Sequence, residues 1–277
     1  MIDGNTALIA HLGYPTATFK APMIYNPHFE AHGINAVVVP MGVTSENYAG
    51  FLRQLFRLTN IRGALVTMPH KIPTLALMDE ISPAARIAGA CNAILLRPDG
   101  TLFGDMFDGE GFVRGVRRKG QQLSGARVLV VGCGGVGSAI AASLAADHVA
   151  EIGLYDVGEK AATALATRLS MHYPDLRITT GGRDPAGYDV VVNATPLGMT
   201  AGDPMPLDVT RIDPSTFVGE VVMKQEMTAF LRAAAARGCR VQVGIDMLFE
   251  QIPAYLEFFG FPTATPETLR AVSRIAY

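Results

Sequence analysis

Apolar residues fall along the chain in short unbroken runs that alternate with stretches of helical spacing. The unbroken run at 128–131 is typical of a strand buried on both faces of a parallel sheet, and residues 151–155 and 188–193 are also expected to form strands. Between such runs, residues 48–58 repeat apolar side chains at intervals of three and four, which predicts an amphipathic helix. Strands and helices in alternation predict an α/β fold with doubly wound parallel sheets.

The pattern predicts the following elements. Expected strands occupy residues 6–10, 35–40, 63–67, 92–96, 128–131, 151–155, 188–193, 217–222 and 240–243. Expected helices begin at Ala21 and after Gly137, and others occupy 48–58, 83–88, 110–119, 228–237, 247–258 and 266–275. The Pro-Asp-Gly sequence at 98–100 predicts a hairpin-like turn.

A length of 277 residues gives room for about two domains. We expect a substrate-binding and catalytic domain over residues 1–108, completed by 245–277, because the final helices have no strand after them. Residues 109–244 would form a Rossmann-type dinucleotide-binding domain, whose first strand follows a polar spacer at 120–125.

Four glycines lie in the turn that follows the strand ending at Val131. Their Gly-x-Gly-x-x-Gly spacing matches the dinucleotide fingerprint, in which glycines let the backbone approach a pyrophosphate at a helix N-terminus. The next strand ends at an aspartate. Its distance from the glycine motif is close to the offset of about 20 residues expected for the acidic residue that binds the ribose. The predicted cofactor-binding residues of this region are Gly132, Gly134, Gly135, Val136, Gly137 and Asp156.

The carboxylate of Asp156 also predicts the choice of cofactor. It would accept a hydrogen bond from the ribose 2′-hydroxyl and repel a 2′-phosphate, and no arginine follows it directly. We therefore expect NAD, with NADP the less favoured cofactor. The alternative is a tight turn of another α/β fold in which Asp156 only caps a helix.

Composition narrows the range of partners. With 49% apolar and 17% charged residues and a net charge of −2, nothing indicates a nucleic-acid or membrane surface. The three cysteines lie far apart without metal spacing, which favours a reducing compartment and no metal site. We see no secretory segment and no apolar run near the ~20 residues of a membrane span, so we expect a cytoplasmic protein. The oligomeric state stays open, a homodimer included.

Two charged residues, Lys71 and Asp108, stand just past predicted strands of the first domain. Open α/β sheets bind their ligands at that end of the strands. An amine oriented by a carboxylate can move the hydroxyl proton during hydride transfer at an alcohol carbon. By spacing alone, a lysine or an aspartate at such a position is more often a solvated surface charge. We expect His70, which precedes Lys71, to face solvent.

Five segments resemble motifs of the shikimate and quinate dehydrogenases, in family order and over nearly the whole chain. They are Val66–Lys71 (in the family Asn-Val-Thr-x-Pro-x-Lys), Gly89–Asn92 (Gly-Ala-x-Asn-Thr), Gly104–Phe112 (Gly-x-Asn-Thr-Asp-Gly-x-Gly), Asn193–Met199 (Asn-Ala-Thr-x-x-Gly-Met) and Gly244–Gln251 (Gly-x-x-Met-Leu-x-x-Gln). The resemblance implies reversible, nicotinamide-dependent oxidation of a ring hydroxyl on a small cyclic hydroxy acid.

The resemblance also implies roles for individual residues. Lys71 and Asp108 would act on the reacting hydroxyl, as catalytic residues. Thr67, Asn92 and Gln251 would hydrogen-bond other hydroxyls of the substrate. The nicotinamide would lie near Asn193, Thr195, Pro196, Met199, Val221 and Gly244.

The chain departs from the family at the end of the site that holds the substrate carboxylate. The family's Ser-x-Ser falls at Phe19-Lys20-Ala21, so both serines are missing, and a family tyrosine falls at Met223. Losing polar groups from a site costs orders of magnitude in rate, so shikimate itself should be a weakened substrate. We expect Thr18 and Lys20 to supply substrate contacts in compensation.

Two other functions are compatible with the same layout. One is a non-catalytic nucleotide-binding or regulatory module that has kept the fold and lost the chemistry. The other is a folate-processing dehydrogenase with the same two-domain arrangement. The joint presence of Lys71, Asn92 and Asp108 argues against the first, and the closing Gly-x-x-Met-Leu-x-x-Gln argues against the second.

Overall fold

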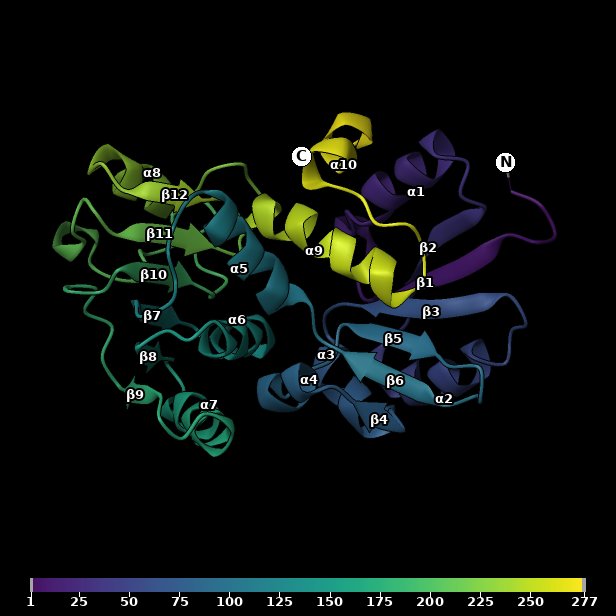
Figure 1. The fold of residues 1–277 in the computed structure, drawn as a ribbon, viewed down its shortest axis with the longest axis horizontal. Coiled ribbons are helices and arrows are strands. Elements are labelled where there is room, and N and C mark those ends of the chain that lie inside the picture. Colours follow the sequence, from purple (N-terminus) through teal and green to yellow (C-terminus); the bar gives the residue numbers. More distant parts are fainter. Residues whose placement is uncertain (1, 276–277) are drawn as a thin grey trace. The chain divides into compact units, whose positions relative to one another are not determined.

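The computed structural model of the protein describes residues 2–275. The chain divides into two compact units, each containing one six-stranded sheet (Figure 1). Unit 1 comprises the residues up to Phe107 and those from Ile252 onward, and unit 2 comprises Asp108–Gln251. An α/β fold is therefore confirmed.

The sheet of unit 1 has the strand order β2-β1-β3-β5-β6-β4. Strand β1 pairs in parallel with β2 and β3, whereas β5 is antiparallel to both β3 and β6. The tight turn at Pro98–Gly100 makes β5 and β6 antiparallel, because so short a connection can join only antiparallel neighbours. The strands are β1 (Ala7–Gly13), β2 (Ala36–Gly42), β3 (Ile61–Val66), β4 (Glu80–Ile81), β5 (Ala93–Leu96) and β6 (Leu102–Asp105).

Helices and short turns surround this sheet. They are η1 (Thr16–Thr18), α1 (Pro22–Ala31), α2 (Ser45–Leu55), α3 (Lys71–Thr74), η2 (Leu75–Leu77), α4 (Pro83–Ala88) and α10 (Pro266–Val272), with the last turns of α9 (Gly244–Phe258). The C-terminal segment packs within unit 1. The rings of Phe29 and Phe261 lie with their centroids 5.3 Å apart, and Nε of Arg62 donates a hydrogen bond to the carbonyl of Phe259.

Unit 2 has an all-parallel sheet of order β12-β11-β10-β7-β8-β9, as the apolar runs predict. Its strands are β7 (Arg127–Val131), β8 (Glu151–Tyr155), β9 (Arg177–Thr180), β10 (Val190–Asn193), β11 (Phe217–Glu220) and β12 (Arg240–Gln242). Its helices are α5 (Asp108–Arg118), α6 (Gly135–Ala146), α7 (Glu159–His172), η3 (Val209–Arg211), α8 (Ala229–Ala236) and the first turns of α9.

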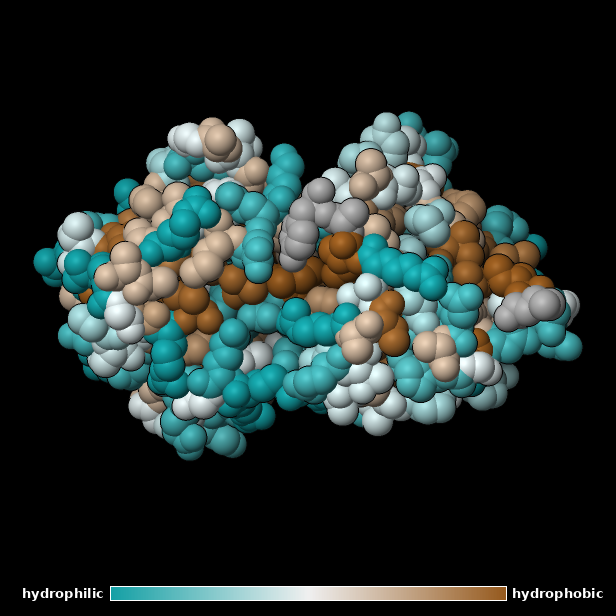
Figure 2. Space-filling view, turned by 90° about the horizontal axis from the view of Figure 1, so that it is seen from above, coloured by the Kyte–Doolittle hydropathy of each residue, from teal (hydrophilic) through white to brown (hydrophobic). Residues whose placement is uncertain are grey.

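The face drawn in Figure 2 mixes hydrophilic and hydrophobic residues. Core side chains of the two sheets, such as Ile9 and Ile94 in unit 1 and Val130 and Val191 in unit 2, are completely buried. Within residues 2–275, no helix combines the length and the apolar character needed to cross a membrane.

Candidate active site

The predicted substrate residues of unit 1 gather where β1 and β3 end. These strands run side by side, with Leu12 opposite Val66, and the amide of Thr67 donates to the carbonyl of Leu12 at 2.8 Å. A tight turn, closed by the amide of His70 donating to the carbonyl of Thr67, then leads into α3, which begins at Lys71. The chain thus places Thr67 and Lys71 at the carboxyl edge of the sheet.

Backbone hydrogen bonds tie the segment of Asn92 to the segment of Lys71. The carbonyl of Lys71 accepts from the amide of Cys91 at 2.8 Å. Asn92 is 1% exposed, and its Oδ1 accepts from the amide of Phe107 at 2.9 Å. The Asn92 side chain is therefore fixed beside the strand end that carries Lys71.

Asp108 and Gln251 lie on neighbouring helices of unit 2. Asp108 is the first residue of α5 and is 3% exposed. A Cβ on Gly109 would collide with the carbonyl of Ala139 in α6, and one on Gly111 would lie 2.7 Å from Cβ of Gln251 in α9. The glycines of the Asp-Gly-x-Gly motif therefore let α5 pack directly against both helices. The buried Oε1 of Gln251 has no partner within residues 2–275.

Lys71 belongs to unit 1 and Asp108 to unit 2. Their pairing therefore stays a prediction from the sequence. Of the residues expected to compensate for the missing serines, Thr18 ends η1 and is exposed, whereas Lys20 is half-buried at the start of α1.

His11 is a buried residue of this region that the sequence analysis missed. It lies in β1, 8% exposed, and its ring stacks on Phe19 with centroids 4.1 Å apart. Burial, with the nearby charge of Lys71, lowers the pKa of His11 to about 3. The available signal was a polar residue within an apolar strand, but the predicted strand stops at Ala10, one residue before His11 and three before the end of β1 at Gly13.

The expectation that His70 faces solvent is wrong. Its side chain is completely buried and stacks on Tyr48 with ring centroids 3.9 Å apart and planes within 3°. Its Nε2 lies 2.8 Å from the carbonyl of Val43. The turn before α3 directs the imidazole into the core beside α2, so His70 supports the backbone that carries Lys71.

In unit 2, the glycine-rich turn after β7 has the close contacts that its motif predicts. Gly132 has φ +102° and donates to the carbonyl of Tyr155 at 2.7 Å. A Cβ on Gly137 would collide with the carbonyl of Gly132. Gly134 precedes α6 and is exposed, and Gly135 and Val136 form the first helical turn. The N-terminus of α6 therefore offers backbone N–H groups of the kind that bind phosphate.

Both carboxylate oxygens of Asp156 are engaged by the backbone. Oδ2 accepts from the amide of Cys133 at 2.7 Å, and Oδ1 accepts from the amide of Gly158 at 2.8 Å. The side chain thus braces the glycine-rich turn and the start of the segment after β8, which gives it a structural role whatever the cofactor.

The loop after β10 is built around Asn193, which is completely buried. Its Oδ1 accepts from the hydroxyl of Thr195 at 2.6 Å, and its Nδ2 donates to the carbonyl of Leu197 at 3.0 Å. Pro196 and Met199 are exposed on the same loop. These bonds give the predicted nicotinamide segment a fixed backbone.

A second group in unit 2 completes this region. The amide of Val221 donates to the carbonyl of Asn193 at 3.2 Å, and a Cβ on Gly244 would collide with the carbonyl of Val222. Glu220 is completely buried and accepts from the hydroxyl of Thr228 at 2.7 Å, while its Oε1 has no partner within residues 2–275.

Glu220 predicts a pH dependence of stability. Burial raises the pKa of its carboxyl to about 7, against an ordinary value of 4.5, although hydrogen bonds from Thr228 and Asn193 oppose the shift. The folded state therefore holds a proton that the unfolded state releases, so unfolding free energy falls as pH rises from about 4.5 to about 7. At about 1.4 kcal/mol per pKa unit, a rise of about 2.5 units corresponds to a loss on the order of 3–4 kcal/mol.

Urea denaturation at pH 5.5 and pH 8 tests this expectation. Glu220→Gln removes the titrating carboxyl, so the unfolding free energy of this variant should fall less between pH 5.5 and pH 8. The variant should then be more stable than the original protein at pH 8. Glu226→Gln, which changes an exposed glutamate on the loop that follows β11, serves as the control and should leave the pH profile unchanged. If the unfolding free energy changed equally between pH 5.5 and pH 8 in the original protein and in Glu220→Gln, the pH dependence would not belong to Glu220.

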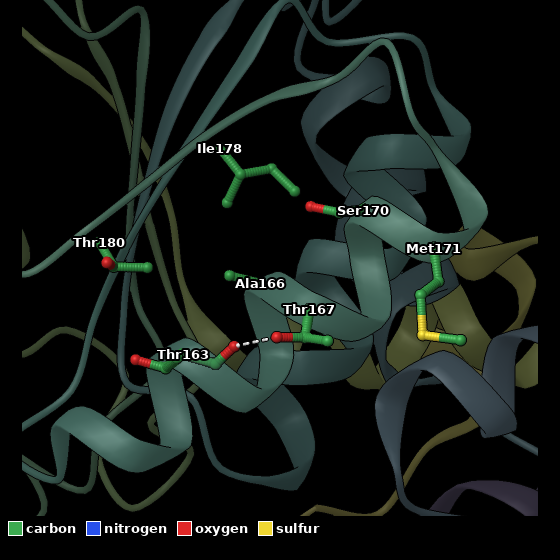
Figure 3. Close-up of a pocket in the computed structure, with 7 residues that line it drawn as sticks. All are labelled: Thr163, Ala166, Thr167, Ser170, Met171, Ile178 and Thr180. Atoms are coloured by element: carbon green, nitrogen blue, oxygen red, sulfur yellow. Dashed lines mark hydrogen bonds between the residues drawn. The ribbon is translucent and has the colours of Figure 1, made fainter.

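Within residues 2–275, no cluster of histidine, cysteine, aspartate and glutamate could hold a metal ion. A shallow groove of about 490 Å³ lies between α7 and β9 in unit 2, and Figure 3 shows the seven residues that line it. The predicted catalytic, substrate-binding and cofactor-binding residues are not among them.

Sequence comparison decides the family. Residues 12–94 match the family model described as the shikimate dehydrogenase substrate binding domain. The shikimate dehydrogenase (NADP(+)) of Rubrobacter xylanophilus is 35% identical over 98% of this chain and 97% of its own length. The chain belongs to the shikimate dehydrogenase family.

Other members of the shikimate dehydrogenase family agree over the same length. The shikimate dehydrogenase (NADP(+)) of Acidiphilium cryptum is 33% identical over 99% of this chain and 98% of its own. A crystal structure of a shikimate dehydrogenase in complex with NADP+ superposes with a TM-score of 0.90 at 25% identity, covering 98% of this chain and 96% of that one. This family membership makes the chain an NAD(P)-dependent dehydrogenase and sets the folate-type alternative aside.

The expectation of NAD over NADP is wrong. Both curated shikimate dehydrogenases are named for NADP(+), and the solved structure holds NADP+. The inference treated Asp156 as a free ribose-binding carboxylate, whereas both of its oxygens already accept backbone hydrogen bonds. An acid at the end of the second strand is therefore a poor guide to the cofactor when the turn itself uses it.

Proposed function

We propose that this protein oxidises a ring hydroxyl of shikimate or a related cyclic polyol acid, and reduces the corresponding ketone, with NADP(H). The observation that carries the proposal is the local framework of Lys71, whose carbonyl is bonded to the segment that fixes Asn92. The shikimate dehydrogenase family supplies the reaction class. All three cysteines are free and buried, which suits a reducing compartment, and we place the enzyme in the cytoplasm.

In the proposed mechanism, Lys71 takes the proton of the reacting hydroxyl during oxidation and returns it to the ketone oxygen during reduction. Asp108 orients the amine and stabilises its charged form. Thr67, Asn92 and Gln251 hydrogen-bond the hydroxyls that do not react. The unpartnered Oε1 of Gln251 supports this last role, because a buried acceptor is normally satisfied.

The cofactor-binding residues fit a dinucleotide. The glycine-rich segment has no room for a Cβ at Gly137, and the twelve-residue helix α6 starts within this segment at Gly135, which suits a pyrophosphate. The fixed loop of Asn193 and Thr195 would hold the nicotinamide end, with Val221 and Gly244 beside it. When bound, NADP+ accepts the hydride that leaves the alcohol carbon.

The proposal predicts turnover of shikimate or quinate with NADP+. Initial rates, measured by nicotinamide absorbance with NADP+ and NAD+ side by side, should give the higher kcat/KM with NADP+. Shikimate, quinate and neutral polyols form the substrate panel. Absence of turnover on the whole panel, with the dinucleotide bound, would overturn the proposal and favour a non-catalytic nucleotide-binding module.

A further inference from the structure

One buried imidazole in unit 1 has no part in the proton transfer proposed above. His11 is 8% exposed, and its Nδ1 is buried without a hydrogen-bond partner among residues 2–275. Leaving a buried polar group unsatisfied costs free energy, and native proteins rarely do so without a reason. A ligand that supplies the missing partner is such a reason.

The surroundings of His11 place it with the predicted substrate residues. Its ring stacks on Phe19 with planes 28° apart, and the charge of Lys71 acts on it. Phe19 and Thr67 meet at Gly13, where a Cβ would lie 2.9 Å from Cζ of Phe19 and would collide with the methyl of Thr67. His11 thus lies in a group with a proposed catalytic residue, a proposed substrate ligand and an aromatic ring.

The charge state of His11 limits what it can bind. Burial and the neighbouring ammonium hold its pKa at about 3, so the ring is neutral at any pH where the enzyme would work. A neutral imidazole has one N–H donor and one acceptor nitrogen, which suits a hydroxyl group. It carries no positive charge with which to hold a carboxylate.

We infer that His11 is a specificity-determining residue that hydrogen-bonds a non-reacting hydroxyl of the substrate, with Phe19 packed behind its ring. The inference rests on the proposed function and names a contact within the same site. The family's Ser-x-Ser, which the resemblance assigns to the substrate carboxylate, is absent at Phe19 and Ala21. Discrimination in this protein would therefore depend more on the substrate hydroxyls, one of which His11 would bond.

Kinetics with substrate analogues test this contact directly. The probes are quinate, shikimate and monodeoxy analogues of each that keep the reacting hydroxyl. In the original protein, one deoxy analogue should lose at least about tenfold in kcat/KM. In His11→Leu, the parent substrate should lose the same factor, mainly through KM, and that analogue should be turned over as well as its parent. If the deoxy analogue still had a kcat/KM at least about tenfold below that of its parent substrate in His11→Leu, the inference would be overturned. This ratio of the two kcat/KM values is the analogue penalty.

A matched control separates the contact from a general loss of buried histidine. His28 in α1 is 2% exposed, and its ring nitrogens also have no hydrogen-bond partner in the described part of the chain, but its ring packs against Phe29 and His32. His28→Leu should keep the analogue penalty. If His28→Leu abolished the difference in kcat/KM between the parent substrate and the deoxy analogue as His11→Leu does, a specific contact of His11 would be contradicted.

A second measurement needs no variant that might fail to fold. With histidine labelled by ¹⁵N in the otherwise unmodified protein, saturating quinate or shikimate should shift the ring-nitrogen resonances of His11. Binding without such a shift overturns the inference and leaves the proposed function intact. The absence of both binding and turnover overturns the proposed function itself, so the two failures are distinguishable.

Discussion

Lys71→Met should lower kcat by about 10²- to 10⁴-fold, the range attributed to a positioned acid or base. The substitution removes the amine that takes the hydroxyl proton and keeps a side chain of similar length. The framework should survive, because the hydrogen bond from the amide of Cys91 is to the backbone carbonyl of Lys71. Steady-state rates at saturating NADP+ measure the loss, and fluorescence titration should give an NADP+ affinity close to that of the original protein.

Asp108→Asn should lower kcat by about 10²-fold or more for a related reason. The amide keeps the shape of the side chain at the start of α5 but cannot stabilise the charged amine. Lys160→Met, at an exposed position on α7, is the matched control for the lysine and should leave kcat unchanged. If the Lys71 and Asp108 variants both turned over within a factor of three of the original protein, the assigned roles would be wrong.

Much of the fold could be predicted because burial on both faces of a parallel sheet leaves unbroken apolar runs. The run at Val128–Val131 correctly predicts β7 and the α/β class, and the strand expected over 188–193 contains the observed β10. Strand β9 was missed because Arg-Ile-Thr-Thr lies at the sheet edge and carries one large apolar residue in four. Its half-buried environment leaves no such run to detect.

Less of the candidate site could be predicted, because the contacts that decide it are tertiary. Motif spacing located Lys71, Asn92 and Asp108 at the ends of elements. It could not show that a turn buries His70 against α2, or that β1 runs far enough to include His11. The same limit explains the cofactor error, since the backbone bonds of Asp156 form only when the turn after β7 is folded.

Gly137→Ala should destabilise the protein and weaken dinucleotide binding together. The new Cβ would collide with the carbonyl of Gly132, and both belong to one short turn that cannot spread without moving the end of β7. Overpacking of this kind costs about 1–3 kcal/mol or more, which outweighs the gain of about 1 kcal/mol from replacing a helical glycine. Thermal melts should show a fall of several degrees, and NADP+ affinity should fall at least about tenfold, because displaced N–H groups no longer point at the pyrophosphate.

Gly134→Ala is the control that makes this result interpretable. A Cβ there would meet nothing within 4 Å, and the φ of −70° is ordinary for any residue. The melting temperature of this variant should therefore stay close to that of the original protein. If Gly137→Ala and Gly134→Ala had the same melting temperature, the turn would accept glycine at position 137 without requiring it. A fall confined to Gly137→Ala shows that the turn requires glycine where the backbone passes closest to itself, and that the cofactor affinity follows from that packing.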